Sequence, residues 1–122
     1  MGVTIDEFLG ILDRLPEVRQ VPGGDWVAMK VRDKGFGYLW ERTETVGLKA
    51  TIDEQIALVS ERPDVFEKQF TTDRFGWVVV HLAKIELDEL TELVTEAWYL
   101  TAPKSLADTY EFPAATGEAL PG

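Results

Sequence analysis

Residues 26 to 50 read WVAMKVRDKGFGYLWERTETVGLKA, and this stretch decides the fold. Apolar or aromatic residues recur at every second position in three runs, 26–32, 36–42 and 45–50. Such alternation is typical of strands that have one buried and one wetter face. The runs are joined by Asp33-Lys34-Gly35 and by Thr43-Glu44, which have the composition of turns. We therefore predict an antiparallel meander of three strands.

A capped helix is predicted on each side of this meander. Thr4-Ile5-Asp6-Glu7 forms a capping box, in which the threonine hydroxyl and the glutamate carboxylate each accept from the other residue's amide. Apolar residues then recur at helical spacing until Pro16. The same four letters return at Thr51-Ile52-Asp53-Glu54, and Pro63 follows that helix.

The rest of the pattern completes two layers. Residues 65–71 are a weaker strand candidate, whereas 76–82 are rich in valine and tryptophan and predict a strong strand. A third amphipathic helix is predicted at 88–100, with Pro103 just beyond its end. The prediction is an α+β two-layer sandwich, in which helices cover one face of an antiparallel sheet of four or five strands.

The composition fits one domain in a chain of 122 residues, with 45% apolar and 28% charged residues. We place this domain at residues 1–103 and expect 104–122, which hold few large apolar side chains, to be a flexible tail. The absence of cysteine excludes disulfides, thiolate metal sites and a cysteine nucleophile. Neither a secretory signal nor an apolar run of about 18 residues is found. We expect a monomeric cytoplasmic protein that does not associate with membranes.

The formal net charge is −10, but residues 26–50 contain five basic and only three acidic residues. An acidic protein repels polyanions at long range, which disfavours binding to nucleic acid. Screening over about 8 Å at physiological salt allows a local basic patch to act separately.

Four segments resemble the MmcQ/YjbR-like family of small bacterial proteins, whose fold is similar to CyaY and frataxin. The segments are Lys30-Val31-Arg32-Asp33-Lys34-Gly35-Phe36 with Tyr38-Leu39-Trp40, Val46-Gly47-Leu48-Lys49, Gly76-Trp77-Val78 with Leu82, and Glu89-Leu90 through Glu96-Ala97-Trp98 to Ala102-Pro103-Lys104. The resemblance implies two helices packed on one side of an antiparallel sheet, with a further helix in the connection. It also implies a DNA-binding role through winged hairpins.

Five basic residues are the candidate DNA-binding residues. Alternation places Lys30, Arg32 and Lys49 on one side of neighbouring strands. Lys34 lies in the first predicted hairpin tip and Arg74 in a loop at 71–75, so both are candidates for wing contacts with the DNA backbone.

Four aromatic residues, Phe36, Tyr38, Trp40 and Trp77, are the candidates for stacking on exposed bases. If the first three lie on the side of the basic residues, cations and rings interleave on one surface. The alternative is that these three face the helices as core, with Gly37 and Leu39 outside.

No set of residues indicates catalysis. His81 is the single histidine, and the only serines, Ser60 and Ser105, lie near a helix end and in the predicted tail, so no catalytic residue is assigned. Gly35-Phe36-Gly37 does not continue into a dinucleotide-binding fingerprint, because Trp40 stands where the third glycine belongs. We predict no enzyme activity, no cofactor and no metal site.

An acidic stripe on the third predicted helix offers a different kind of surface, suited to a cation or a basic partner or simply solvated. Its members are Asp88, Glu89, Glu92 and Glu96. The sequence thus predicts a non-catalytic binding protein with DNA as the first candidate ligand. The alternative is a module for a protein partner or a small ligand, using the aromatic sheet face or the acidic stripe.

Overall fold

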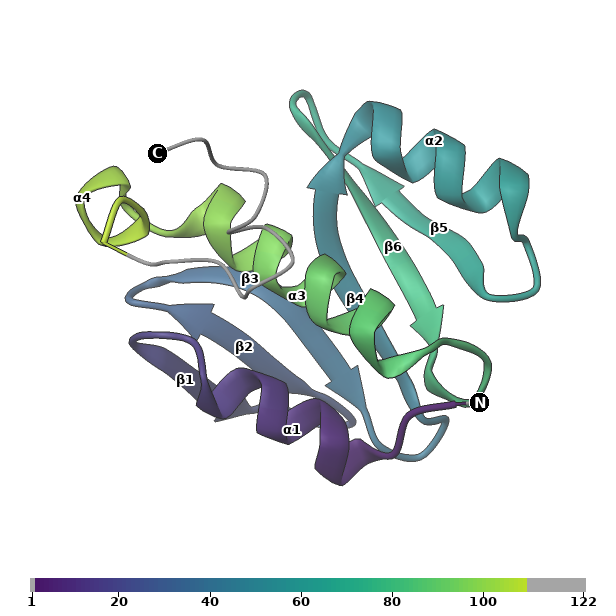
Figure 1. The fold of residues 1–122 in the computed structure, drawn as a ribbon, viewed down its shortest axis with the longest axis horizontal. Helices are drawn as coiled ribbons and strands as arrows, with labels where there is room; N and C mark the ends of the chain where they lie inside the picture. The colour runs from purple at the N-terminus through teal and green to yellow at the C-terminus, as the bar shows by residue number, and fades with distance from the viewer. Residues whose placement is uncertain (1, 110–122) are drawn as a thin grey trace.

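The computed structural model describes residues 2–109. Six strands form one antiparallel sheet in the order β1-β2-β3-β4-β6-β5 (Figure 1). The strands are β1 Val18–Pro22, β2 Val27–Val31, β3 Lys34–Trp40, β4 Thr45–Thr51, β5 Phe66–Thr71 and β6 Phe75–His81. The helices are α1 Ile5–Asp13, α2 Ile52–Glu61, α3 Leu87–Thr101 and α4 Lys104–Ala107, with a 3-10 turn, η1, at Leu82–Lys84.

The three longer helices, α1, α2 and α3, pack on the same face of the sheet (Figure 1). One continuous apolar core fills the space between the layers, and Phe8, Trp98 and Leu39 are fully buried members of it from α1, α3 and β3. Within residues 2–109, no helix covers the opposite face, which we call the open face. Strand register places Tyr38, Gly47 and Lys49 on it.

The predicted two-layer α+β sandwich is confirmed, but the sheet has six strands rather than four or five. The strand that the sequence analysis missed is β1, which pairs with β2 at one edge of the sheet. Its burial does not alternate, since Val18 and Val21 are partly buried while Arg19 and Gln20 between them are both exposed. A short edge strand that ends at Pro22 lacks the period-two pattern by which strands are recognised.

The two predicted caps differ in one contact. At α1 the Thr4 hydroxyl accepts from the amide of Glu7 at 3.1 Å and the Glu7 carboxylate accepts from the amide of Thr4 at 2.9 Å, which confirms the capping box. At α2 the Thr51 hydroxyl accepts from the amide of Glu54 at 3.1 Å, but the return contact is missing. The Glu54 carboxylate is therefore left for another role.

Two β-bulges change which side chains share a face. Between β2 and β3 the register passes from Met29↔Gly37 to Lys30↔Gly35, which leaves Phe36 as the extra residue. Between β5 and β6 it passes from Lys68↔Val78 to Phe70↔Trp77, which leaves Gln69 as the extra residue. A bulge breaks the alternation of side chains beyond it.

The first residues of the predicted tail, 104–107, form the short helix α4, and Ala107 is buried against the core. Residues 110–122, which include the rest of that predicted tail, lie outside the described part of the chain. The domain boundary at residue 103 stays a prediction. A search of the described residues finds no helix long and apolar enough to cross a bilayer.

Candidate nucleic-acid interface

An aromatic stripe crosses the open face and consists of Trp40, Tyr38, Trp77 and Phe70, from β3, β6 and β5. The ring centroid of Tyr38 lies 6.0 Å from that of Trp40 and 5.7 Å from that of Trp77. The ring centroids of Phe70 and Trp77 are 5.4 Å apart. The four rings form an unbroken series of tilted contacts, because each lies within ordinary aromatic-pair distance of the next.

The predicted stacking set is corrected at Phe36, which is fully buried in the core. The bulge between β2 and β3 is the reason, because it interrupts the alternation that would have kept Phe36 on the side of Tyr38 and Trp40. The alternative, with all three aromatics in the core, is also wrong, because Leu39 takes the core position and Tyr38 contacts Trp77 on the open face.

Two exposed aromatic residues were missed by the sequence analysis. Phe70 in β5 and Trp26 before β2 each have 43% of their surface exposed, whereas Trp77 retains only 8%. Trp77 is therefore a buried member of the stripe that packs against its neighbours, while Phe70 has a ring accessible to a ligand. Trp26 and Trp40 both line a groove between the β1–β2 loop and the β3–β4 turn. Sequence gave no sign of Phe70, since it follows the bulge in a weakly predicted strand.

The middle of the stripe is shaped by Gly47 and Gln69. A Cβ atom on Gly47 would lie 2.5 Å from the Gln69 side-chain oxygen and 3.1 Å from the Trp40 ring, so a larger residue here would require both side chains to shift. The Gln69 Oε1 atom is buried and has no hydrogen-bond partner. An unpaired buried acceptor costs about 1–3 kcal/mol, so Gln69, which lies beside the stripe, would gain stability by meeting a hydrogen-bond donor.

Three of the five predicted basic residues lie near one end of the sheet, and we call Lys34, Lys49 and Arg74 the cationic cluster. They come from the start of β3, from β4 and from the β5–β6 turn. Register places Lys49 on the open face, whereas Lys34 pairs with the core residue Val31 at the hairpin tip. Partial burial lowers the pKa of Lys49, and the positive charges of Lys34 and Arg74 lower it further. The Lys49 Nζ atom also lies 4.0 Å from the centre of the Phe75 ring.

No ion pair of the described residues neutralises the cationic cluster, although Asp33 and Asp73 directly precede Lys34 and Arg74 in the chain. Among the residues that the structure describes, no carboxylate is within salt-bridge distance of Lys34, Lys49 or Arg74. Like charges that are held together without an ion pair repel one another, and a bound anion relieves that repulsion. The cluster is therefore suited to a phosphate group.

Arg32 is not available in the way that the sequence suggested. It lies in the β2–β3 turn with a positive φ of 56°, where strand alternation no longer applies. Its guanidinium donates to both carboxylate oxygens of Glu17, at 2.7 and 3.1 Å, and this contact raises the pKa of Arg32. Lys30 does lie on the open face, beside Arg19 of the edge strand.

Charge is divided between the two layers of the sandwich. Helices α1, α2 and α3 contain ten aspartates and glutamates and no lysine or arginine. The six strands contain five lysines and arginines and one carboxylate, Glu67. That carboxylate contacts the Nε2 atom of His81. The net charge of −10 thus conceals an acidic set of helices and a sheet richer in bases, of which Arg19, Lys30 and Lys49 lie on the open face while Lys34 and Lys68 pair with core residues.

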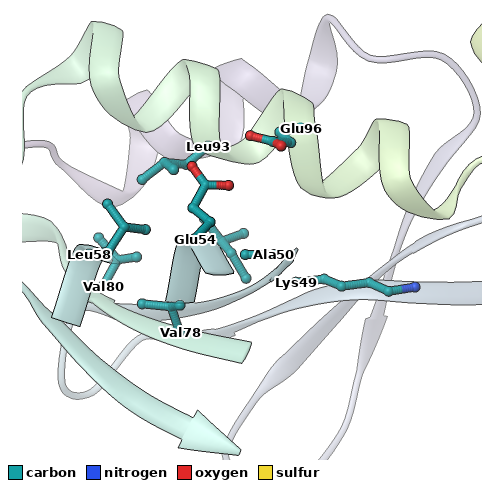
Figure 2. Close-up of a pocket in the computed structure, with 9 residues that line it drawn as sticks. Lys49, Ala50, Glu54, Leu58, Val78, Val80, Leu93 and Glu96 are labelled. Atoms are coloured by element: carbon teal, nitrogen blue, oxygen red, sulfur yellow. The ribbon is translucent and has the colours of Figure 1, made fainter. Parts of the chain in front are cut away.

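The acidic stripe is divided by its contacts with α2. Glu89 accepts a hydrogen bond from the Arg62 guanidinium at 2.6 Å, whereas Glu96 faces Glu54 across the cleft between α2 and α3 (Figure 2). Partial burial, followed by the charge and hydrogen bond of Glu96, raises the pKa of Glu54 from 4.5 to about 7. Apolar side chains surround this pair and leave space for about one water molecule. No group of three or more potential metal-ligating side chains occurs within residues 2–109.

The comparisons with known proteins agree with the fold. A family model described as YjbR matches residues 13–100. The chain is 36% identical over 92 residues to the uncharacterised proteins Rv2570 of Mycobacterium tuberculosis and Mb2600 of Mycobacterium bovis. Each alignment covers 73% of this chain and 55% of the relative, so the chain spans about half the length of the curated relatives it matches.

A crystal structure of the Deinococcus radiodurans protein DR2400, with the family-model domain DUF419, has the same fold. It superposes with a TM-score of 0.73 over 97% of this chain and 89% of that chain, at 18% sequence identity. The predicted resemblance is confirmed by the match to residues 13–100, and the chain belongs to the YjbR family.

Proposed function

We propose that this protein binds DNA through the open face and catalyses no reaction on it. The observation that carries the proposal is the division of charge between the layers. Register places three strand bases, Arg19, Lys30 and Lys49, on the open face with one strand carboxylate, Glu67, whereas the three long helices hold ten acids and no base. A polyanion would be repelled from the helical side and attracted to the sheet, because screening over about 8 Å separates the two surfaces.

The cationic cluster supplies the phosphate contacts in this proposal. Lys34, Lys49 and Arg74 come from separate segments and bring positive charge together at one end of the sheet, beside the open face. Contacts to phosphates position DNA and add affinity, but they carry no sequence information. Binding is therefore expected to depend strongly on salt and weakly on base sequence.

A second candidate is a protein partner or small ligand that uses the aromatic surface. The groove lined by Trp26 and Trp40 and the exposed ring of Phe70 favour it, because exposed aromatic residues are enriched in binding surfaces. Such a ligand would bind with little dependence on salt, which separates this candidate from DNA.

Replacing Lys49 and Arg74 together with glutamate is expected to flatten the salt dependence of DNA binding. Each lost phosphate contact reduces the slope of log affinity against log salt by about 0.7 for a single strand and about 0.9 for a duplex. The double variant should lose about 1.4 to 1.8 units of slope and bind at least tenfold more weakly at about 50 mM salt. Fluorescence anisotropy with labelled oligonucleotides, repeated over a salt series, measures both quantities.

The matched control is Lys84→Glu with Lys104→Glu, which makes the same change in net charge at exposed residues outside the strands. If binding follows total charge alone, both double variants will behave alike, and the open face will lose its support as the DNA interface. If neither single-stranded nor duplex DNA is retained by the wild-type protein at about 50 mM salt, the DNA proposal fails.

A further inference from the structure

We infer that the open face takes DNA as a single strand, with unpaired bases stacked on the aromatic stripe. This inference rests on the proposed DNA binding and specifies the form of DNA that is bound. A duplex offers its phosphates and groove edges, whereas the faces of its bases are covered by their neighbours. Only unpaired bases can lie flat against aromatic side chains on a protein surface.

Three of the four rings of the stripe are exposed enough for a base to stack on them. Phe70 is 43% exposed, and Tyr38 and Trp40 are partly exposed. Trp77 is buried and contacts the rings of Tyr38 and Phe70. Sheets that bind single-stranded nucleic acid place two or three bases on such rings.

The cationic cluster continues from the stripe. Lys49 pairs directly with Trp77 across β4 and β6, so its side chain leaves the sheet beside the ring series. Lys34 and Arg74 lie close enough to influence the Lys49 ammonium group. Bases on the rings and phosphates beside the cluster are the two contacts that one strand of nucleic acid makes at once with a basic, aromatic surface.

Gln69 adds a polar group to the stripe. Its Oε1 atom lies against Gly47, beside the Trp40 ring, and has no hydrogen-bond donor. The bulge in β5 places Gln69 next to Phe70, the most exposed ring of the stripe. A rotation of this long side chain toward a stacked base would give the amide a partner on the base edge, which relieves the unpaired oxygen.

The decisive experiment compares single-stranded oligo-dT with a duplex of the same length, for wild-type protein and for Phe70→Leu. Single-stranded DNA should bind the wild type more tightly and quench its tryptophan fluorescence more strongly than duplex. Phe70→Leu should weaken single-strand binding by about 5- to 150-fold, the range for loss of one base stack, and leave duplex binding unchanged. Tyr99→Leu is the matched control, because Tyr99 is 42% exposed on α3, away from the strands.

The outcomes separate this inference from the function on which it rests. Equal binding of single strand and duplex, both weakened by the Lys49 and Arg74 variant and neither by Phe70→Leu, overturns stacking and keeps DNA binding. No binding of either DNA removes the proposed function, and this inference with it. If Phe70→Leu fails to fold, fluorescence of the wild type decides: stronger quenching by oligo-dT supports stacking, and equal or absent quenching overturns it.

Discussion

Replacing Gln55 with leucine is expected to lower the free energy of unfolding by about 3 kcal/mol. Gln55 in α2 is only 3% exposed, and its side-chain amide donates to the backbone oxygens of Phe70 at 3.0 Å and Trp77 at 2.9 Å. Its oxygen accepts from the Thr71 hydroxyl at 3.0 Å. Leucine fills a similar volume but makes none of these three bonds, each of which contributes about 1 kcal/mol in a buried site.

Urea unfolding of wild-type and variant protein measures this loss. Gln20→Leu is the control, because it makes the same change at an exposed position of the edge strand β1, where an effect within about 0.5 kcal/mol is expected. A loss below about 1 kcal/mol for Gln55→Leu would show that the α2 amide does not hold β5 and β6. Because these bonds reach the strand beside Phe70, the variant should also bind single-stranded DNA more weakly.

The protein is expected to lose stability as the pH rises from about 4.5 to 7 through the ionisation of Glu54. The pKa of Glu54 is raised from 4.5 to about 7 in the folded state, so its contribution is fully present below about pH 4.5. Above that pH the unfolded chain releases the proton first, and the contribution is gone once the folded state ionises near pH 7. A shift of this size would equal about 3 kcal/mol in a dry site. Solvent screening of this partly exposed carboxyl reduces it to about 1 to 2 kcal/mol.

Thermal or urea unfolding between pH 5 and 8 measures the effect as the difference between wild type and Glu54→Gln. Glutamine keeps the backbone cap on Thr51 and can donate to Glu96, so the variant should be the more stable protein at pH 8. Asp53→Asn is the control, because it removes an exposed carboxylate one residue away. A Glu54→Gln variant with the pH profile of the wild type would show that the ionisation of Glu54 does not lower the stability of the protein.

Most of the fold could be predicted because periodicity and capping are local signals. A pattern of only a few residues is enough to recognise several elements. These are the helix that begins at the Thr4 capping box, the helix before Pro63 and the strand that contains Val78 and Val80. The edge strand at Val18 was missed because its buried and exposed residues do not alternate. An edge strand such as β1 is defined by its pairing with a neighbouring strand, and its own sequence carries little signal.

The candidate site was predicted less well, because its composition depends on two bulges. Alternation placed Lys49 on the open face but left two alternatives for Phe36, Tyr38 and Trp40, all on that face or all in the core. Neither is right as a whole, because Tyr38 and Trp40 lie on the open face while the first bulge turns Phe36 into the core. Arg32 was misplaced because the turn and the Glu17 carboxylate together remove it from the strand. A bulge is a property of two strands in register, so the sequence of one strand does not reveal it.

The segregation of acids onto the helices has a consequence for how many copies a strand of DNA can hold. A molecule bound through its sheet turns ten carboxylates outward, so the coated polymer presents a negative exterior once more. Each further copy on the same strand lies beside the acidic helices of its neighbours. In the proposed complex, adjacent molecules are therefore expected to repel one another at low ionic strength and to be spaced apart along the strand.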